Sequence, residues 1–297
     1  MRFILLYFSG IILKMKIERR GTAGMRYKEI REILTSAGTV DPAGEAALLI
    51  CRFCGITPAD IPLVRERDFD CPGLTEAVRR RGQRYPLQYI LGEWGFCSES
   101  YEVSPGCLIP RSDTELLVEA AAELIKTGGK FIEAGVGSGC VSVSLLAVRR
   151  DVTGTAFDIS KDALEIAGRN AKKNGVEGRL TLIPGDMLDG DFWGNAGKFD
   201  AVISNPPYIP SGEIAGLEPE LSFEPRQALD GGADGLDFYR SIIKNAASVL
   251  CEGGIVLLEV GYGEDVSVAA IAGGYGYITE VRRDIEGRGR VLILSRK

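Results

Sequence analysis

Histidine is absent from all 297 residues of the chain. This absence excludes Ser-His-Asp and Cys-His nucleophilic sites, the HExxH metal site and any imidazole general base. The chemistry must therefore depend on carboxylates, amides, hydroxyls, backbone groups or a reactive cofactor.

Cysteines are present, but they lack the spacing of a disulfide or metal framework. There are seven, an odd number, and Cys51 and Cys54 form a CxxC inside an apolar stretch with a helical pattern. Neither a second CxxC nor a histidine completes a zinc site. We therefore expect no metal site, and we expect reduced, buried thiols in a cytoplasmic protein.

The chain also lacks a basic excess. It has 35 Lys and Arg against 41 Asp and Glu, for a net charge of -6. Proteins that grip duplex nucleic acid through many phosphate contacts usually carry a basic excess, so we expect no direct nucleic-acid binding. One predicted helix carries a dense basic cluster, which we interpret as a solvated face: Arg79, Arg80, Arg81 and Arg84.

The apolar run at residues 3–13 is too short for a membrane-spanning helix, which needs about 20 residues. Charged residues at 14–20 occupy the place where a signal-peptide cleavage site would lie. We therefore expect no membrane segment. We interpret residues 1–24 as an extension outside the fold, with Met25 at the start of the first helix.

Residues 25–84 carry the pattern of a small helical bundle. Apolar residues recur at helical spacing over 30–37 and 46–53, and a glycine follows each run. A third helix is predicted over 72–84. Residues 85–110 contain β-forming residues separated by glycines, which predicts a β-hairpin that links this domain to the next.

Residues 111–297 alternate between predicted strands and helices. This alternation is typical of an α/β fold, in which a parallel sheet carries helices on both faces. The last two strands are predicted to pair antiparallel at one edge of the sheet. The predicted strands are 130–133, 153–158, 180–183, 199–204, 255–259, 277–281 and 291–295.

The turn after the first of these strands is rich in glycine. The sequence FIEAGVGSG places Gly135, Gly137 and Gly139 there, with GxGxG spacing instead of the GxGxxG of dinucleotide sites. Asp158 ends the second strand, where its carboxylate can accept hydrogen bonds from both hydroxyls of a ribose. Asp186 follows the third strand and can accept from an adenine amino group. Such features at successive strand ends predict a nucleoside-containing cofactor.

The fourth strand of the series ends in the sequence NPPY. Proline has no N–H and a fixed φ, so this loop is stiff and presents carbonyl oxygens without competing donors. The Asn205 side-chain oxygen and the Pro206 carbonyl can accept both hydrogens of one NH2 group, and Tyr208 offers a flat face for a planar group. Pro207 completes the loop. The pattern predicts methyl transfer to a planar amide or amine nitrogen, with an electrophilic cofactor as methyl donor.

Four further segments give the chain a resemblance to a known family. They are YPLQYILGEWGF (85–96), GCLIPRSDTELLVE (106–119), FEPRQALDGGADGLDFYR (223–240) and GGIVLLEVG (253–261). Together with NPPY, they resemble the HemK/PrmC-type peptide chain release factor glutamine methyltransferases. The resemblance runs from about Met25 to the C-terminus.

This resemblance implies a class I S-adenosylmethionine-dependent methyltransferase. Its Rossmann-like, seven-stranded sheet with an antiparallel edge would occupy residues 111–297, and a helical bundle at 25–84 would dock a class I release factor. The acceptor would be the side-chain nitrogen (N5) of the glutamine in a Gly-Gly-Gln loop. We expect a cytoplasmic monomer.

The residues assigned to the cofactor, S-adenosyl-L-methionine, are Gly135, Val136, Gly137, Ser138, Gly139, Asp158, Asp186, Met187 and Asn205. Those assigned to the substrate are Asn205, Pro206, Pro207 and Tyr208, of which Asn205, Pro206 and Tyr208 are the catalytic candidates.

The chain departs from the family pattern at a few positions. Glu133 stands where Asp is usual, Val136 where Thr is common, and Ser112-Asp113 where Pro-Glu is more usual. We interpret these as tolerated variation. The alternatives are a ribosomal-protein glutamine methyltransferase, a nucleic-acid base N-methyltransferase, and a dehydrogenase or cofactor-binding sensor. GxGxG spacing disfavours the dehydrogenase, and a sensor would not need NPPY.

Overall fold

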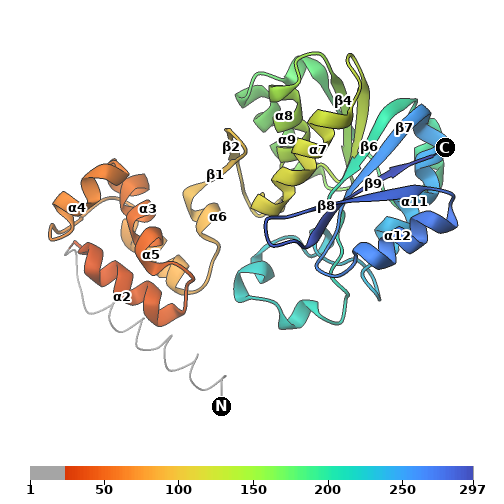
Figure 1. Ribbon diagram of the computed structural model, residues 1–297. Coiled ribbons are helices and arrows are strands. Elements are labelled where there is room, and N and C mark those ends of the chain that lie inside the picture. Colours follow the sequence, from red (N-terminus) through yellow and green to blue (C-terminus); the bar gives the residue numbers. More distant parts are fainter. Residues whose placement is uncertain (1–23, 297) are drawn as a thin grey trace. The chain divides into compact units, whose positions relative to one another are not determined.

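A computed structural model describes residues 24–296, which form two compact units. Of these residues, the first unit comprises residues 24–92 together with the segment Glu218–Phe223, and the second comprises Glu93–Leu217 and residues 224–296 (Figure 1). The predicted extension at residues 1–24 lies outside the described residues except for Gly24.

The first unit is helical, as the sequence predicted for 25–84. Asp41 caps its second helix by accepting a hydrogen bond from the Gly44 N–H at 2.9 Å, and Gly38 and Gly55 end two helices in the left-handed conformation. The core contains Ile30, Leu34, Leu49, Ile50 and Val78, all fully buried. The helices are α2 (Tyr27–Ala37), α3 (Pro42–Cys54), η1 (Pro58–Asp60), α4 (Ile61–Val64), α5 (Leu74–Gly82) and α6 (Leu87–Leu91).

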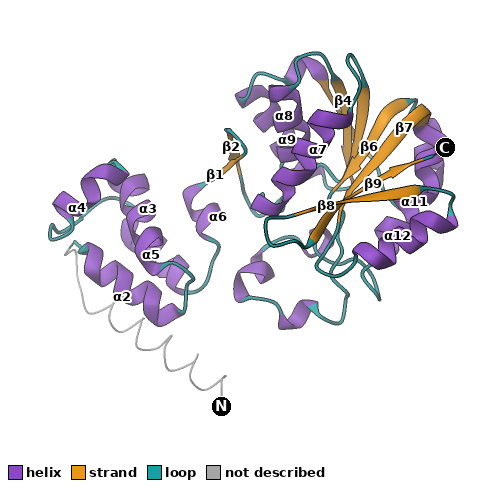
Figure 2. Ribbon diagram, in the orientation of Figure 1, coloured by secondary structure: helices purple, strands orange, loops and turns teal. Residues whose placement is uncertain are grey.

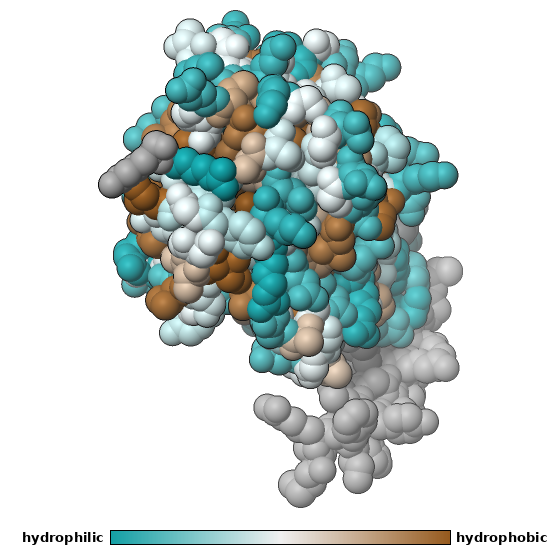
Figure 3. Space-filling model, turned by 90° about the vertical axis from the view of Figure 1, so that its right-hand side faces the viewer, coloured by the Kyte–Doolittle hydropathy of each residue, from teal (hydrophilic) through white to brown (hydrophobic). Residues whose placement is uncertain are grey.

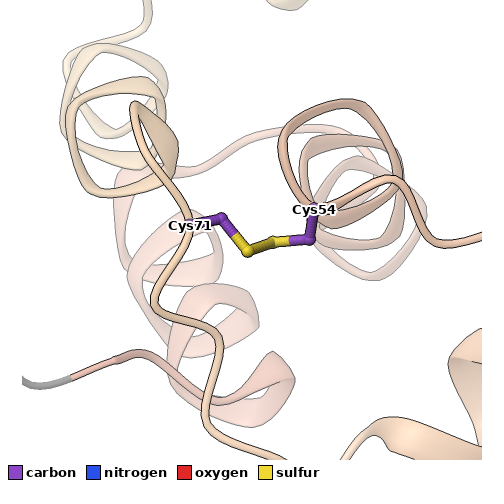
Figure 4. Close-up of a disulfide and its surroundings, with 2 residues drawn as sticks. All are labelled: Cys54 and Cys71. Atoms are coloured by element: carbon purple, nitrogen blue, oxygen red, sulfur yellow. A yellow bond between two sulfur atoms is a disulfide. The ribbon is translucent and has the colours of Figure 1, made fainter.

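The expectation of reduced thiols is wrong for two cysteines of this unit. Cys54, the last residue of α3, forms a disulfide with Cys71, and their Cα atoms are 5.5 Å apart (Figure 4). Cys51, one helical turn before Cys54, is half-buried and outside the bond. The sequence could not show this pairing, because Cys71 lies 17 residues away in the loop before α5 and cysteine spacing alone does not fix connectivity.

The interpretation of residues 79–84 as a solvated face is also wrong for Arg81. Its side chain is 4% exposed, with two nitrogens donating to the Glu45 carboxylate at 2.6 and 2.9 Å. Glu220 accepts from Arg81 at 2.8 Å and from Arg84 at 2.5 and 2.6 Å. Because a buried charge is costly unless it is paired, these ion pairs explain how an arginine occupies the interior of the bundle.

The second unit contains a seven-stranded sheet with the strand order β5-β4-β3-β6-β7-β9-β8 (Figure 2). The first five strands run parallel, whereas β9 pairs antiparallel with both β7 and β8. The predicted parallel sheet with an antiparallel edge is therefore confirmed. The strands are β3 (Lys130–Ala134), β4 (Thr153–Asp158), β5 (Leu180–Pro184), β6 (Phe199–Ser204), β7 (Leu250–Glu259), β8 (Ile278–Arg283) and β9 (Gly289–Ser295).

Helices cover both faces of this sheet and give it two apolar cores. One core packs α7 (Glu115–Leu124), α8 (Cys140–Val148) and α9 (Lys161–Lys173) against the strands. The other packs α10 (Gly190–Asn195), α11 (Asp237–Val249) and α12 (Asp265–Gly274). Because helices cover both faces, nearly all residues of β3 and β6 are buried, as is typical of parallel sheets. Since both faces of the sheet are covered, a ligand-binding site is expected at the carboxyl ends of the strands.

The predicted hairpin is present over part of the expected range. Strands β1 (Glu93–Phe96) and β2 (Glu99–Glu102) pair antiparallel and belong to the second unit. The first part of the predicted range, residues 87–91, is not a strand, because the helix α6 occupies these positions. Pro86 stands at the start of α6, and Gly92 ends it in the left-handed conformation.

The surface shown in Figure 3 is largely hydrophilic, with apolar residues in small separate areas. Among residues 24–296, no single helix combines the length and apolar composition needed to cross a membrane. The bent pair Pro42–Cys54 and Pro58–Val64 meets those two criteria only when its helices are counted together.

Candidate active site

A cavity opens in the second unit at the carboxyl ends of β3, β4 and β6. It encloses about 770 Å³ of empty space, solvent at its mouth included. Of the predicted site residues, the cavity brings together Gly135, Val136, Gly137, Ser138, Asp158, Met187, Asn205 and Pro207. Gly139, Asp186, Pro206 and Tyr208 do not line it.

The glycine turn after β3 forms one wall of the cavity. Gly135 and Gly137 have φ of 77° and 52°, which glycine adopts without strain. A β-carbon at Gly137 would meet nothing within 4 Å, so its backbone faces open space. At Gly139 the same atom would lie 3.1 Å from the Ala167 side chain, so this glycine serves the close packing of α8 against α9.

Asp158, at the end of β4, ties the glycine turn to the neighbouring strand. One carboxylate oxygen accepts from the Gly137 N–H at 3.0 Å and the other from the Ser160 N–H at 2.9 Å. A carboxylate has about four acceptor sites, so capacity remains for a ligand in the cavity. Burial raises the pKa of Asp158, and these backbone hydrogen bonds oppose that effect.

Glu133, in β3, brings a buried carboxyl group to the cavity wall. It is 2% exposed, and one oxygen accepts hydrogen bonds from the Ser142 N–H at 3.0 Å and from the Ser142 hydroxyl. Burial raises the pKa of Glu133 to about 8, although the bonds from Ser142 favour the charged form. The longer side chain at this position is therefore accommodated by the first turn of α8.

Asp186 and Met187 follow β5 but lie differently. Met187 lines the cavity, and its carbonyl is fixed by the Trp193 indole N–H at 3.0 Å and the Ser241 hydroxyl at 2.6 Å. Asp186 instead accepts from the Leu188 N–H at 2.8 Å, which closes a local turn. The sequence analysis assigned both residues to the cofactor, but only Met187 lines the cavity.

Asn205, the first residue after β6, forms another part of the cavity wall. Its side-chain nitrogen donates to the Thr114 hydroxyl at 3.1 Å. Thr114 is 2% exposed and also lines the cavity. Tyr208 is half-buried, and burial raises the pKa of its phenol to about 12, so the phenol stays protonated at neutral pH.

The segment 229–235 packs against the NPPY loop. The Ile209 N–H donates to the Leu229 carbonyl at 2.9 Å, and the Gly231 N–H returns a bond to the Ile209 carbonyl at 2.8 Å. A β-carbon at Gly231 would lie 2.7 Å from the Tyr208 Cα. The glycines of DGGADG therefore allow two backbone segments to approach closely, which fixes the loop that carries Asn205 and Tyr208.

Sequence reasoning missed a third part of the wall, made by residues 106–111 together with Pro225, Gln227 and Ala228. Glu224, which is buried, holds these two segments together. It accepts from the Ile109 N–H at 3.0 Å and forms an ion pair with Arg111. Both segments lie in motifs that carried the family resemblance. Only these motifs could have indicated that the two segments belong to the site, because nothing in their local sequence pattern assigns their residues to a cavity.

The strand order, the helices on both faces and the cavity at the strand ends define a class I methyltransferase fold. Residues 112–216 match the family described as methyltransferase small domain, and residues 27–92 match the PrmC N-terminal domain.

Known proteins that are similar to the chain over nearly its full length identify the particular family. A release factor glutamine methyltransferase from Nitratidesulfovibrio vulgaris is 38% identical over 277 residues, which cover 91% of this chain and 93% of that protein. A protein of the same name from Moorella thermoacetica is 38% identical, with coverage of 89% and 95%. The chain belongs to the release factor glutamine methyltransferase family, and the resemblance stated from the motifs is confirmed.

A solved protein-(glutamine-N5) methyltransferase (release factor-specific) from Alicyclobacillus acidocaldarius is 29% identical to the chain. The match covers 66% of this chain and 99% of that one, with a TM-score of 0.42.

Proposed function

We propose that this chain transfers a methyl group from S-adenosyl-L-methionine to the side-chain amide nitrogen of the glutamine in the Gly-Gly-Gln motif of class I release factors. The observation that carries the proposal is the position of Asn205. It lies on the wall of a cavity that also contains the glycine turn and Asp158. Its amide N–H is engaged by Thr114, which leaves the amide oxygen to accept from a substrate.

The residues of the cavity fit the proposed cofactor. In the glycine turn, the Gly137 backbone faces open space. Asp158 keeps acceptor capacity for ribose hydroxyls, and Met187 adds an apolar surface. When bound, the cofactor supplies an electrophilic methyl group on a sulfonium. The protein contributes binding and orientation.

The NPPY loop is proposed to orient the acceptor. Asn205 and the Pro206 carbonyl would accept the two N–H bonds of the glutamine carboxamide, and Tyr208 would cover its planar face. Holding both N–H bonds turns the face of the nitrogen toward the methyl group. No strong base is needed, because the methylated amide nitrogen is acidic enough to lose one proton readily. A chain without histidine is compatible with that chemistry.

We propose that the first unit docks the release factor, supported by the match of residues 27–92 to the PrmC N-terminal domain. Docking away from the cavity would supply specificity, since a glutamine flanked by glycines offers few side chains to recognise. The proposal places the protein in the cytoplasm as a monomer.

The test is to incubate the protein with labelled cofactor and one of four acceptors: an unmodified release factor, ribosomal protein, ribosomal RNA or DNA. We expect label in the release factor, at the side chain of the Gly-Gly-Gln glutamine, as mapped by tandem mass spectrometry. A release factor with alanine in place of this glutamine is the matched control. Label that persists in the control, or that enters only another acceptor, would overturn the assignment.

A further inference from the structure

Glu259, the last residue of β7, is a buried carboxyl group for which neither the fold nor the cofactor cavity gives a reason. It is 3% exposed, and its Oε2 atom has no hydrogen-bond partner among residues 24–296. A buried polar atom without a partner costs free energy, so its retention at this position calls for a role.

The register of the sheet places Glu259 beside Asn205. Strands β6 and β7 are parallel neighbours in which Ser204 pairs with Leu258. The next residues along the chain are Asn205, directly after β6, and Glu259, the last residue of β7. The two side chains therefore leave adjacent strand ends at the same edge of the sheet.

Thr114 connects the two residues. Its hydroxyl accepts from the Asn205 side-chain nitrogen at 3.1 Å. It also acts on Glu259, because hydrogen bonding by Thr114 lowers the pKa of that carboxyl group and so favours the carboxylate. A hydroxyl has a single hydrogen. When that hydrogen goes to a carboxylate, which can only accept, the hydroxyl oxygen must receive a hydrogen bond from Asn205. The asparagine then has one orientation, with its nitrogen toward Thr114 and its oxygen free for the substrate.

We propose that Glu259 is a positioning residue for methyl transfer: through the Thr114 hydroxyl, it fixes the Asn205 amide with its oxygen available to the acceptor nitrogen. Without the carboxylate, Thr114 can donate to Asn205 instead, and the flipped amide presents N–H groups to the N–H groups of the acceptor. This inference rests on the proposed function of Asn205.

The surroundings of Glu259 allow its protonation state to reverse the direction of these hydrogen bonds. Burial raises its pKa to about 7. A protonated carboxyl group can donate to Thr114, whereas the carboxylate cannot. The charged and titratable groups that act on or respond to Glu259 are Arg111, Asp113, Cys140, Tyr208, Tyr239 and Arg290. Arg111 forms an ion pair with Glu224, and Arg290 forms ion pairs with Asp113 and Asp284.

Matched variants test the proposal. Thr114→Val removes the hydroxyl and keeps the shape of the side chain, whereas Thr114→Ser keeps the hydroxyl. Glu259→Leu removes the acceptor, whereas Glu259→Gln keeps one carbonyl oxygen. We expect Thr114→Val and Glu259→Leu to lower kcat on the order of 10- to 100-fold, because a misoriented acceptor loses productive geometry. Thr114→Ser should recover most of that loss, whereas Glu259→Gln, whose amide can donate as the protonated carboxyl group does, should stay low at every pH.

Two readouts separate positioning from structural support. Affinity for S-adenosylmethionine, measured by calorimetry, should stay within about threefold in Thr114→Val and Glu259→Gln. The wild-type kcat/KM for the protein substrate, at saturating cofactor, should rise as pH passes through 7. Glu259→Gln should lose that step. Unchanged kcat in Thr114→Val, or the same pH step in Glu259→Gln, would overturn the proposal, even where Glu259→Leu fails to fold.

A further readout needs no substrate. The side-chain NH2 resonances of Asn205, assigned by comparison with Asn205→Asp, should shift in Thr114→Val and exchange faster with solvent. Unchanged resonances would contradict the hydrogen bond on which the proposal depends. If these resonances behave as expected but wild type fails to methylate a release factor, the proposed function fails and the Thr114–Asn205 contact stands.

Discussion

The carbonyl oxygen of Tyr208 lies so close to Gly235 that a β-carbon at Gly235 would come within 2.4 Å of it. Gly235 also has φ of 79°, which side chains other than glycine rarely adopt. The segment 229–235, which contains Gly235, therefore holds the NPPY loop by backbone contact. The position of the catalytic candidates therefore depends on a residue that does not line the cavity.

We predict that Gly235→Ala displaces this loop and lowers kcat on the order of 10-fold or more, because the acceptor is misplaced. Gly212→Ala is the matched control, since a β-carbon there would meet nothing within 4 Å. Steady-state kinetics on both variants checks the prediction. Equal activity of the two would show that the contact does not position the loop.

Asp158→Ala should weaken binding of S-adenosylmethionine by about 2 kcal/mol, which is roughly 30-fold, because a buried charge-assisted acceptor is lost. Glu165→Ala, an exposed carboxylate on α9, is the control. Calorimetry gives both affinities. The assignment of Asp158 to the cofactor would be wrong if its variant bound as tightly as the control.

Glu133 predicts a pH dependence of stability. Its pKa is raised to about 8 in the folded state, against an ordinary value of 4.5. The unfolded chain therefore releases this proton at lower pH, and the free energy of unfolding falls as pH rises from about 4.5 to 8. Glu133→Gln, which keeps an acceptor for Ser142, should flatten this fall. Denaturant unfolding at pH 5 and pH 8 checks it. An identical loss in wild type and variant would contradict the shifted pKa.

The Cys54–Cys71 disulfide should stabilise the first unit. Closing a loop of this size constrains the unfolded chain and is worth about 3 kcal/mol. Cys71→Ser should therefore lower the melting temperature, and addition of a dithiol reductant should have a similar effect on wild type but none on the variant. Cys97→Ser, at an exposed cysteine, is the control. A reductant effect that persists in Cys71→Ser would exclude this bond as its cause.

Much of the catalytic fold could be predicted from the sequence because its signals are local. Thr153–Asp158 and Phe199–Ser204 are strands with the expected bounds, and the glycine turn follows β3 as predicted. The positions of Asp158 and Asn205 followed from the rule that parallel strands bring their carboxyl ends to one edge. Whether these residues bind the proposed ligands stays a prediction.

The remainder depends on contacts between distant residues, which no local pattern contains. Arg81 is polar and lies in a basic cluster, so it was interpreted as solvated, but its partner Glu220 is 139 residues away. Thr114 is 91 residues from Asn205, and only the folded sheet brings them together. The short helix α6 was missed because aromatic and branched residues favour strands on average, while the proline and glycine that bound it decided otherwise.

The most direct test of the central claim compares wild type with Asn205→Ala on an unmodified release factor, under single-turnover conditions with saturating cofactor. Wild type should place one methyl group on the side-chain nitrogen of the loop glutamine, located by tandem mass spectrometry. Asn205→Ala should slow this step on the order of 100-fold, while the glycine turn and Asp158 still bind the cofactor. A rate within about threefold of wild type, with the glutamine still methylated, would contradict the role of Asn205 as the group that orients the acceptor.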